Sequence, residues 1–153
     1  MVLLENMVIS GKVTIVVRRP DGTIRSIRET RKNMKVAGTM NLIASMMCND
    51  AAQAATCNKF GMGSGPDVVS ADTALSGEKT SRTIGRFSHD AGAAQWNLSF
   101  SLTEWTESNS LYQAAIFNTL TGATMYLKAT FLQMTVMSQD VLNCSWLQSI
   151  SSV

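Results

Sequence analysis

The segment QWNLSFSLTEW, residues 95–105, alternates large apolar side chains with small polar ones, which restricts the chain to folds that contain a one-sided β-strand. One side of the extended segment carries Trp96, Leu98, Phe100 and Leu102. The other side carries Asn97, Ser99, Ser101 and Thr103. We therefore expect the apolar side of this strand to line the core.

Several other segments within residues 57–150 are also expected to form strands. TSRTIGRFSHD precedes the first strand, and we expect it to be the partner strand, turned by Asp90-Ala91-Gly92, while LYQAAIFNT, TMYLKATFLQM and VLNCSWLQSI follow. Strands do not alternate with helices, which argues against a doubly wound sheet. The 153 residues fit a single domain, residues 1–153, and we expect it to be mainly β, an antiparallel β-sandwich or barrel.

Two further elements are expected in the first third of the chain. Residues 11–31 predict a β-hairpin, because Val13, Ile15 and Val17 alternate with more polar residues and Pro20-Asp21-Gly22 supplies turn chemistry. Residues 38–55 carry apolar side chains at helical spacing and predict the one α-helix of the fold.

Positive charge is concentrated in the hairpin region. Eight of the 13 basic residues lie between Lys12 and Lys35, where only Asp21 and Glu29 oppose them, so the local charge is 8 − 2 = +6 and the remainder of this +2 chain carries 2 − 6 = −4. The candidate partner-binding residues are Arg18, Arg19, Arg25, Arg28 and Arg31, which we expect at outward positions.

Three interpretations of this basic hairpin remain open: a solvated surface, a contact for an acidic protein surface, or a nucleic-acid contact. Nucleic acid is the least favoured, because the hairpin lacks aromatic side chains for base stacking. Charged residues make up only 16% of the whole chain, and a surface of uncharged polar groups is less costly to bury against another protein.

The glycine-rich segment GMGSG, residues 61–65, raises the possibility of a phosphate-binding loop. A Walker loop needs a Lys followed by Ser or Thr after its last glycine, whereas Gly65 is followed by Pro66 and Asp67. The segment also lacks the third glycine of the dinucleotide-binding fingerprint at its required spacing. We therefore expect a structural turn and no cofactor.

Catalytic and metal-binding patterns are absent from the sequence. The single histidine, His89, lies next to Asp90 at a predicted strand end, and the three cysteines, Cys48, Cys57 and Cys144, are widely separated. Glu104 and Glu107 form no recognisable acid–base pair. We expect no catalytic residue and no metal site, and reduced cysteines in a product of the cytoplasm.

Signals for secretion or membrane insertion are not expected either. The first ten residues contain Glu5 and no basic residue. The apolar stretch MNLIASMMC is far shorter than the roughly 20 residues that a membrane-spanning helix requires.

The order of these segments resembles a widespread group of tailed-bacteriophage virion proteins. That group has a GTG turn, an Asp-Thr-Ala-Leu segment with a Glu and an Arg after it, and a later apolar-Phe-Asn strand pair. Here the corresponding positions are Gly61 to Gly65, Asp72 to Leu75, Glu78, Arg82, and Ile116 to Phe131, within a likeness that covers residues 11–148. GMGSG replaces GTG, and Gln113-Ala114-Ala115 replaces a Glu-Ala-Gly segment, so one expected carboxylate is missing.

The resemblance implies a non-enzymatic structural protein located in the virion. It favours a capsid decoration or cement subunit that contacts the major capsid protein and forms a homo-oligomer in the particle. A tail, baseplate or fibre-adaptor protein is the alternative, and a nucleic-acid-binding module is the third.

Overall fold

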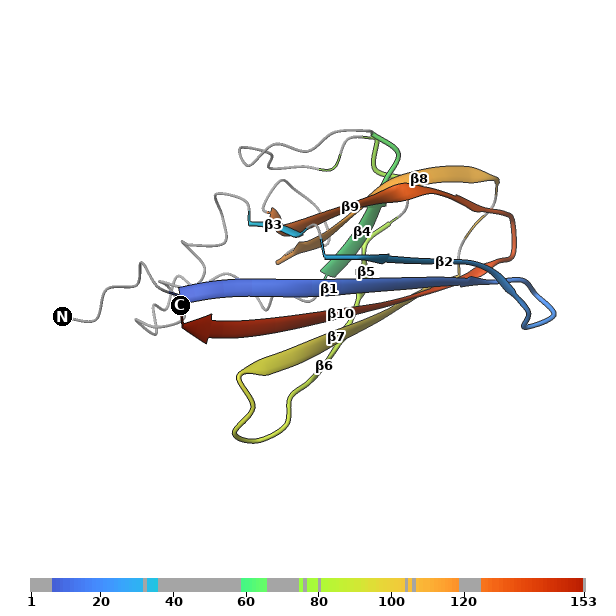
Figure 1. Ribbon diagram of the computed structural model, residues 1–153. Helices are drawn as coiled ribbons and strands as arrows, with labels where there is room; N and C mark the ends of the chain where they lie inside the picture. Colours follow the sequence, from blue (N-terminus) through green and yellow to red (C-terminus); the bar gives the residue numbers. More distant parts are fainter. Residues whose placement is uncertain are drawn as a thin grey trace.

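The computed structural model describes residues 7–31, 33–35, 59–65, 75, 77–79, 81–103, 105, 107–118 and 125–152. The helix expected at residues 38–55 lies outside these ranges. Within them, strands form two antiparallel five-stranded sheets that face one another as a sandwich (Figure 1). The expectation of a mainly β, antiparallel, sandwich-like fold is confirmed.

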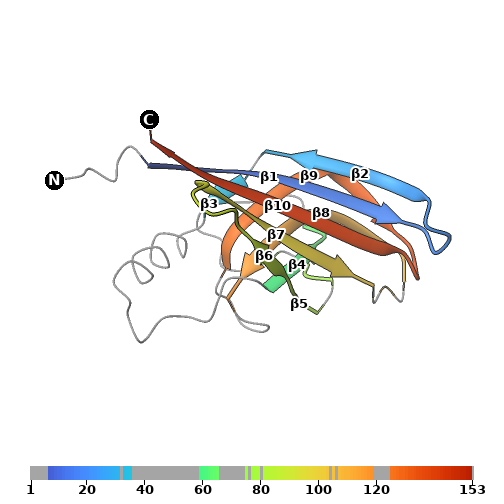
Figure 2. The same cartoon turned by 90° about the horizontal axis from the view of Figure 1, so that it is seen from below.

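We call the two sheets A and B. Sheet A has the order β2 (Ile24–Thr30), β1 (Met7–Arg18), β10 (Val141–Ser152), β7 (Gln95–Leu102), β6 (Arg86–Ser88). Sheet B has the order β3 (Asn33–Lys35), β9 (Met125–Val136), β8 (Asn109–Phe117), β4 (Lys59–Gly63), β5 (Thr83–Ile84). Figure 2 shows the two layers from below.

Strands β1 and β10 form the long central ladder of sheet A. Their register runs without interruption from Met7 opposite Ser152 to Arg18 opposite Val141. The first strand of the described chain therefore pairs with the last, and Figure 1 shows them side by side along their whole length. The predicted hairpin is formed by β1 and β2, with Gly22 in the turn at a φ of 86°.

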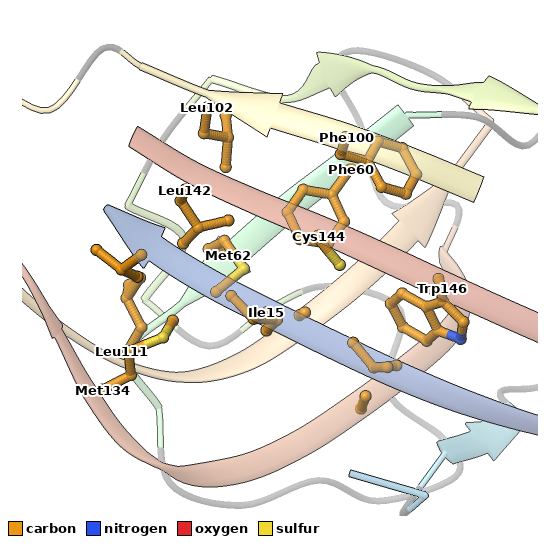
Figure 3. Close-up of a cluster of buried hydrophobic side chains, with 14 of the residues drawn as sticks. Ile15, Phe60, Met62, Phe100, Leu102, Leu111, Met134, Leu142, Cys144 and Trp146 are labelled. Carbon is orange, nitrogen blue, oxygen red and sulfur yellow. The ribbon is translucent and has the colours of Figure 1, made fainter. Parts of the chain in front are cut away.

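The core lies between the sheets and confirms most of the expected apolar positions. Val13, Ile15 and Val17 of β1 are at most 1% exposed, and the inward residues of β7, namely Leu98, Phe100 and Leu102, are also buried. Trp96, at the start of that row, is only half-buried. The Phe100 ring stacks on Phe60 of sheet B with centroids 4.5 Å apart (Figure 3), which joins the two sheets at the centre of the core.

The chain crosses from one sheet to the other at Gly85. Strand β5 belongs to sheet B and β6 to sheet A, and Gly85 lies between them against the ring of Phe100, where a Cβ atom would collide with the ring. The segment predicted as a partner for β7 is thus confirmed, since Arg86–Ser88 pairs with residues 97–99. The expected turn follows, with a hydrogen bond from the Ala93 amide to the Asp90 carbonyl.

The outer faces of the two sheets differ. On sheet B the outward residues Ala115 and Phe117 of β8 and Met125 of β9 are buried and form a second apolar cluster with Leu75, whereas Leu132, Gln133 and Thr135 of β9 are exposed. On sheet A the outward positions of β7 and β10 include the exposed hydroxyl and amide side chains of Ser99, Ser101, Asn143 and Ser145. Antiparallel sheets commonly leave one face to solvent or to a partner, and here that face belongs to sheet A.

Candidate functional site

The glycine-rich segment is a strand and not the expected turn. Gly61 and Gly63 lie within β4, opposite Ala115 and Gln113 of β8, and both are buried. Positive φ angles occur at Gly22, Gly77 and Gly92 among the described glycines, so Gly61, Gly63 and Gly65 are not required for a left-handed turn. The prediction failed because it interpreted the glycines as a local break, whereas Gly61 provides space for another segment of the chain.

That segment is residues 77–79, which lies along β4. Gly63 forms an antiparallel bridge with Glu78, the Ser64 amide donates to the Gly77 carbonyl, and the Lys79 amide donates to the Met62 carbonyl. A Cβ atom at Gly61 would lie 2.8 Å from Glu78 Oε1 and 3.3 Å from the Phe117 ring. Glycine at this position therefore permits the close approach of a carboxylate and an aromatic ring.

The carboxylate belongs to an ion pair stacked on the ring. Arg82 donates from Nε to Glu78 Oε1 at 2.8 Å and from Nη2 to Oε2 at 3.2 Å. Its guanidinium carbon lies 3.4 Å from the centroid of the Phe117 ring. The Arg82 side chain is 5% exposed and that of Glu78 is 27% exposed, so the pair is largely removed from water.

This arrangement brings together residues that the virion-protein resemblance singled out from distant parts of the chain: Gly61, Leu75, Glu78, Arg82 and Phe117. Both oxygens of Glu78 accept hydrogen bonds from Arg82, and the Glu78 bridge to Gly63 and the stacking of Arg82 on Phe117 hold this segment onto sheet B. These five residues of the resembling pattern thus form one packed cluster. Residues 72–74 and 119–124 of that pattern lie outside the described ranges.

The hairpin arginines do not share one orientation. Strand β2 contains a β-bulge: Val17 is opposite Ser26, but Arg18 is opposite Ile24, so Arg25 is an extra residue. Arg25 turns towards the β9–β10 connection and donates to Asp140, from Nε to Oδ2 at 2.6 Å and from Nη2 to Oδ1 at 3.2 Å. The Asp140 side chain has no exposed area.

Arg28 is also engaged within the molecule. It lies opposite the buried Ile15, on the inward row of β2, and therefore not at the outward position expected from the sequence. Its guanidinium donates to the carbonyl oxygens of Leu132 at 3.2 Å and Gln133 at 2.8 Å, both in β9 of the opposite sheet. Arg25 and Arg28 thus connect the edge of sheet A to the β9 side of the sandwich.

Arg18, Arg19 and Arg31 are exposed. Arg19 donates to the Thr23 hydroxyl and to the Ile24 carbonyl, both at 3.2 Å, which orders the hairpin turn. The structure therefore separates the five candidate arginines into two that bond to β9 or the β9–β10 connection and three that present charge at the surface. Their role in binding a partner stays a prediction.

The remaining reactive side chains lie apart from these clusters. His89 Nε2 is 2.8 Å from the Ala93 carbonyl in the turn before β7. Cys144 is buried in the core, and burial raises the pKa of its thiol far above the ordinary value. The described residues contain no group of three or more His, Cys, Asp or Glu side chains that could hold a metal ion. Cys48, Cys57 and Glu104 lie outside the described residues.

No helix in the part of the chain that the structure describes is long and apolar enough to cross a membrane. Comparisons of the chain with protein-family models, with curated proteins and with solved structures found no match.

Proposed function

We propose that this chain is a non-enzymatic structural protein of a tailed-bacteriophage virion, and that it acts as a capsid decoration or cement subunit on the major capsid shell. The observation that carries the proposal is the cluster of Gly61, Leu75, Glu78, Arg82 and Phe117. These residues supply the pattern that resembles the virion group, and their mutual contacts give that pattern a physical role in the fold.

The character of the surface supports a role in assembly. Sheet B is covered on its outer face around Ala115, Phe117 and Met125, whereas the outer face of sheet A presents uncharged side chains such as Ser99, Ser101 and Asn143. Hydroxyl and amide groups can both donate and accept, so they can be buried against another protein without isolating a charge. A decoration subunit needs a contact of this kind, moderate in strength and repeated over the shell.

The exposed hairpin arginines add a directional contribution. Arg18 and Arg19 lie at the turn end of the hairpin and Arg31 just beyond the other end of β2, in a region that is positively charged while the rest of the chain is negative. Such asymmetry favours one docking orientation towards an acidic patch on the capsid protein. Because exposed charges are screened beyond about 10 Å at 0.1 M salt, binding should weaken as the salt concentration rises.

The location can be tested directly by purifying particles and measuring the chain by quantitative mass spectrometry in separated shell and tail fractions. Enrichment with the shell supports the decoration role. Enrichment in the tail fraction supports instead the tail, baseplate or fibre-adaptor alternative. Absence from both fractions would contradict the virion proposal.

The contribution of the hairpin can be tested with purified protein and particles that lack it. The double variant Arg18→Glu/Arg19→Glu should bind the shell less tightly than the wild type. Two single variants of equal charge change provide the control: Arg18→Glu in the hairpin should weaken binding, whereas Lys79→Glu, at an exposed site beside β4 of sheet B, should bind normally. Equal loss in both variants would mean that only net charge matters. Retention on DNA that disappears selectively in the hairpin variant would favour the nucleic-acid alternative.

A further inference from the structure

The bulge in β2 changes which side chains the hairpin presents. Ile24 and Ile27 are separated by an odd number of positions, so a regular strand would direct them to opposite faces. In the structure Ile27 lies opposite Val16, whose neighbours Ile15 and Val17 point into the core. Beyond the bulge, Ile24 lies opposite the exposed Arg18. Cross-strand partners share a face, so both isoleucines lie on the outer face of sheet A.

These residues form an exposed apolar strip, which we define as Ile24, Ile27 and Val16. Ile24 is 45% exposed and Ile27 is 50% exposed. Val16, on β1 between β2 and β10, is half-buried. Along the same cross-strand row Val16 is followed by Asn143 and then Ser101, both uncharged and exposed. The strip therefore continues into the polar face without an intervening charge.

The charges around the strip are predominantly positive. Glu29 is paired with Lys12 at 2.9 Å, and Asp21 accepts hydrogen bonds from the amide and hydroxyl of Thr23. Arg18, Arg19 and Arg31 are exposed nearby. The rim thus contains four basic residues, including Lys12, against two acidic ones, a net charge of 4 − 2 = +2.

We propose that the apolar strip is the centre of the surface that docks onto another virion protein, and that this partner offers an aliphatic or aromatic surface bordered by acidic residues. This inference rests on the proposed virion function. An apolar centre with arginines at its border is the usual composition of a protein interface.

Charge and chemistry distinguish this partner from two other occupants. A second copy related by a two-fold axis would place one positive rim against another, which is unfavourable. DNA would satisfy the arginines through its phosphates, but phosphate contacts leave the isoleucines without an apolar surface to cover them. A specific interface buries about 800 Å² on each partner, so the contact extends from the strip over Asn143 and Ser101.

The test places a photo-crosslinking amino acid at position 27 of the chain in assembled particles, and at position 84 as the control. Ile84 is a suitable control because it is also an exposed isoleucine, 61% exposed, but lies on β5 at the edge of sheet B. Position 27 should crosslink to a virion protein at a segment that contains acidic residues, and position 84 should not crosslink to that segment.

Affinity for particles that lack the chain provides the second measurement. Ile27→Ser should weaken binding about tenfold, as expected for an interface residue that contributes somewhat more than 1 kcal/mol. This loss should be the same at low and high salt, because it comes from apolar contact. Ile84→Ser should bind as the wild type does.

The outcomes separate the two proposals. If the chain is absent from the particle, the proposed function fails and this inference fails with it. If the chain is present but position 27 crosslinks to a second copy, to DNA or to nothing, only the inference is overturned. Normal shell binding by Ile27→Ser would overturn it as well.

Discussion

Arg25 of β2 and Asp140, 115 positions later in the sequence, form a two-pronged ion pair that connects the basic hairpin to the β9–β10 connection. The Asp140 carboxylate also accepts from the Met137 amide at 2.9 Å, and its side chain is fully buried. The bulge that directs Arg25 to this partner also directs Ile24 to the outer face of sheet A. One irregularity therefore determines both an internal contact and an exposed one.

We predict that Asp140→Ala destabilises the fold. The change removes the acceptor of Arg25 and of the Met137 amide, and hydrogen bonds to charged groups contribute about 1.5–3 kcal/mol each in favourable cases. A loss of about 2 kcal/mol in the free energy of unfolding should be seen by urea denaturation. The control Asp90→Ala removes an exposed carboxylate and should change stability by less than about 0.5 kcal/mol. Similar values for both variants would contradict the structural role of Asp140.

The same pair predicts a dependence of stability on pH. Burial alone raises the pKa of Asp140, but the hydrogen bonds from Arg25 and the Met137 amide and the nearby positive charges outweigh it, so the pKa lies below its ordinary value. The folded protein thus binds fewer protons than the unfolded chain near pH 4, where an ordinary Asp titrates. This stabilisation is present above about pH 4 and is lost as the pH falls through the folded pKa.

Urea midpoints of the wild type and of Asp140→Asn, measured across the acid range, provide the check. The wild type should be the more stable at neutral pH, and the difference should narrow below about pH 4. A difference that stays constant down to about pH 2 would mean that this carboxylate does not contribute through its ionisation.

Gly61→Ala should destabilise the fold through crowding. The new methyl group would lie 2.8 Å from Glu78 Oε1 and 3.2 Å from Leu75, so the Glu78 carboxylate must move and its pairing with Arg82 is disturbed, at a cost of about 1 kcal/mol. A double-mutant cycle with Glu78→Ala measures the contact. The cost of Gly61→Ala should be smaller in the Glu78→Ala background, since the closest atom is then absent. If Gly61→Ala costs the same free energy of unfolding in both backgrounds, the crowding does not come from Glu78.

Phe100→Ala should lower the free energy of unfolding by about 3–5 kcal/mol. Phe100 stacks on Phe60 across the sheets and also packs against Gly85 at the crossing between them, so its removal leaves a cavity where both sheets meet. The neighbouring residue Ser99 points to the exposed face, and Ser99→Ala should change stability by less than about 0.5 kcal/mol. Equal midpoints for wild type and Phe100→Ala would contradict the inward orientation of this strand.

Local sequence patterns were sufficient to identify most of the strands. The alternation around Phe100 and around Ile15 survives in the structure because a strand has one buried and one exposed side, and its sequence records which side is which. The Pro20-Asp21-Gly22 turn was also predictable, since a positive φ at Gly22 is a local requirement.

The candidate site was less predictable, because its contacts join distant segments. Gly61 resembled a turn when considered with its neighbours in sequence, and its purpose became clear only from the approach of Glu78 and Phe117. Arg28 resembled a surface residue, and only the position of β9 shows that its donors bind the carbonyls of Leu132 and Gln133.

The sequence by itself determined that this protein is mainly β, with an amphipathic strand around Phe100 and a hairpin that concentrates positive charge. These properties depend on residue type and on a period of two, which are local. The tertiary structure decided which arginines remain at the surface and which side chains lie between them. A bulge of one residue in β2 reverses the side-chain alternation beyond it. No local sequence pattern marks the position of this bulge. Its position depends on β1 and Asp140, which contact β2 only after the chain has folded.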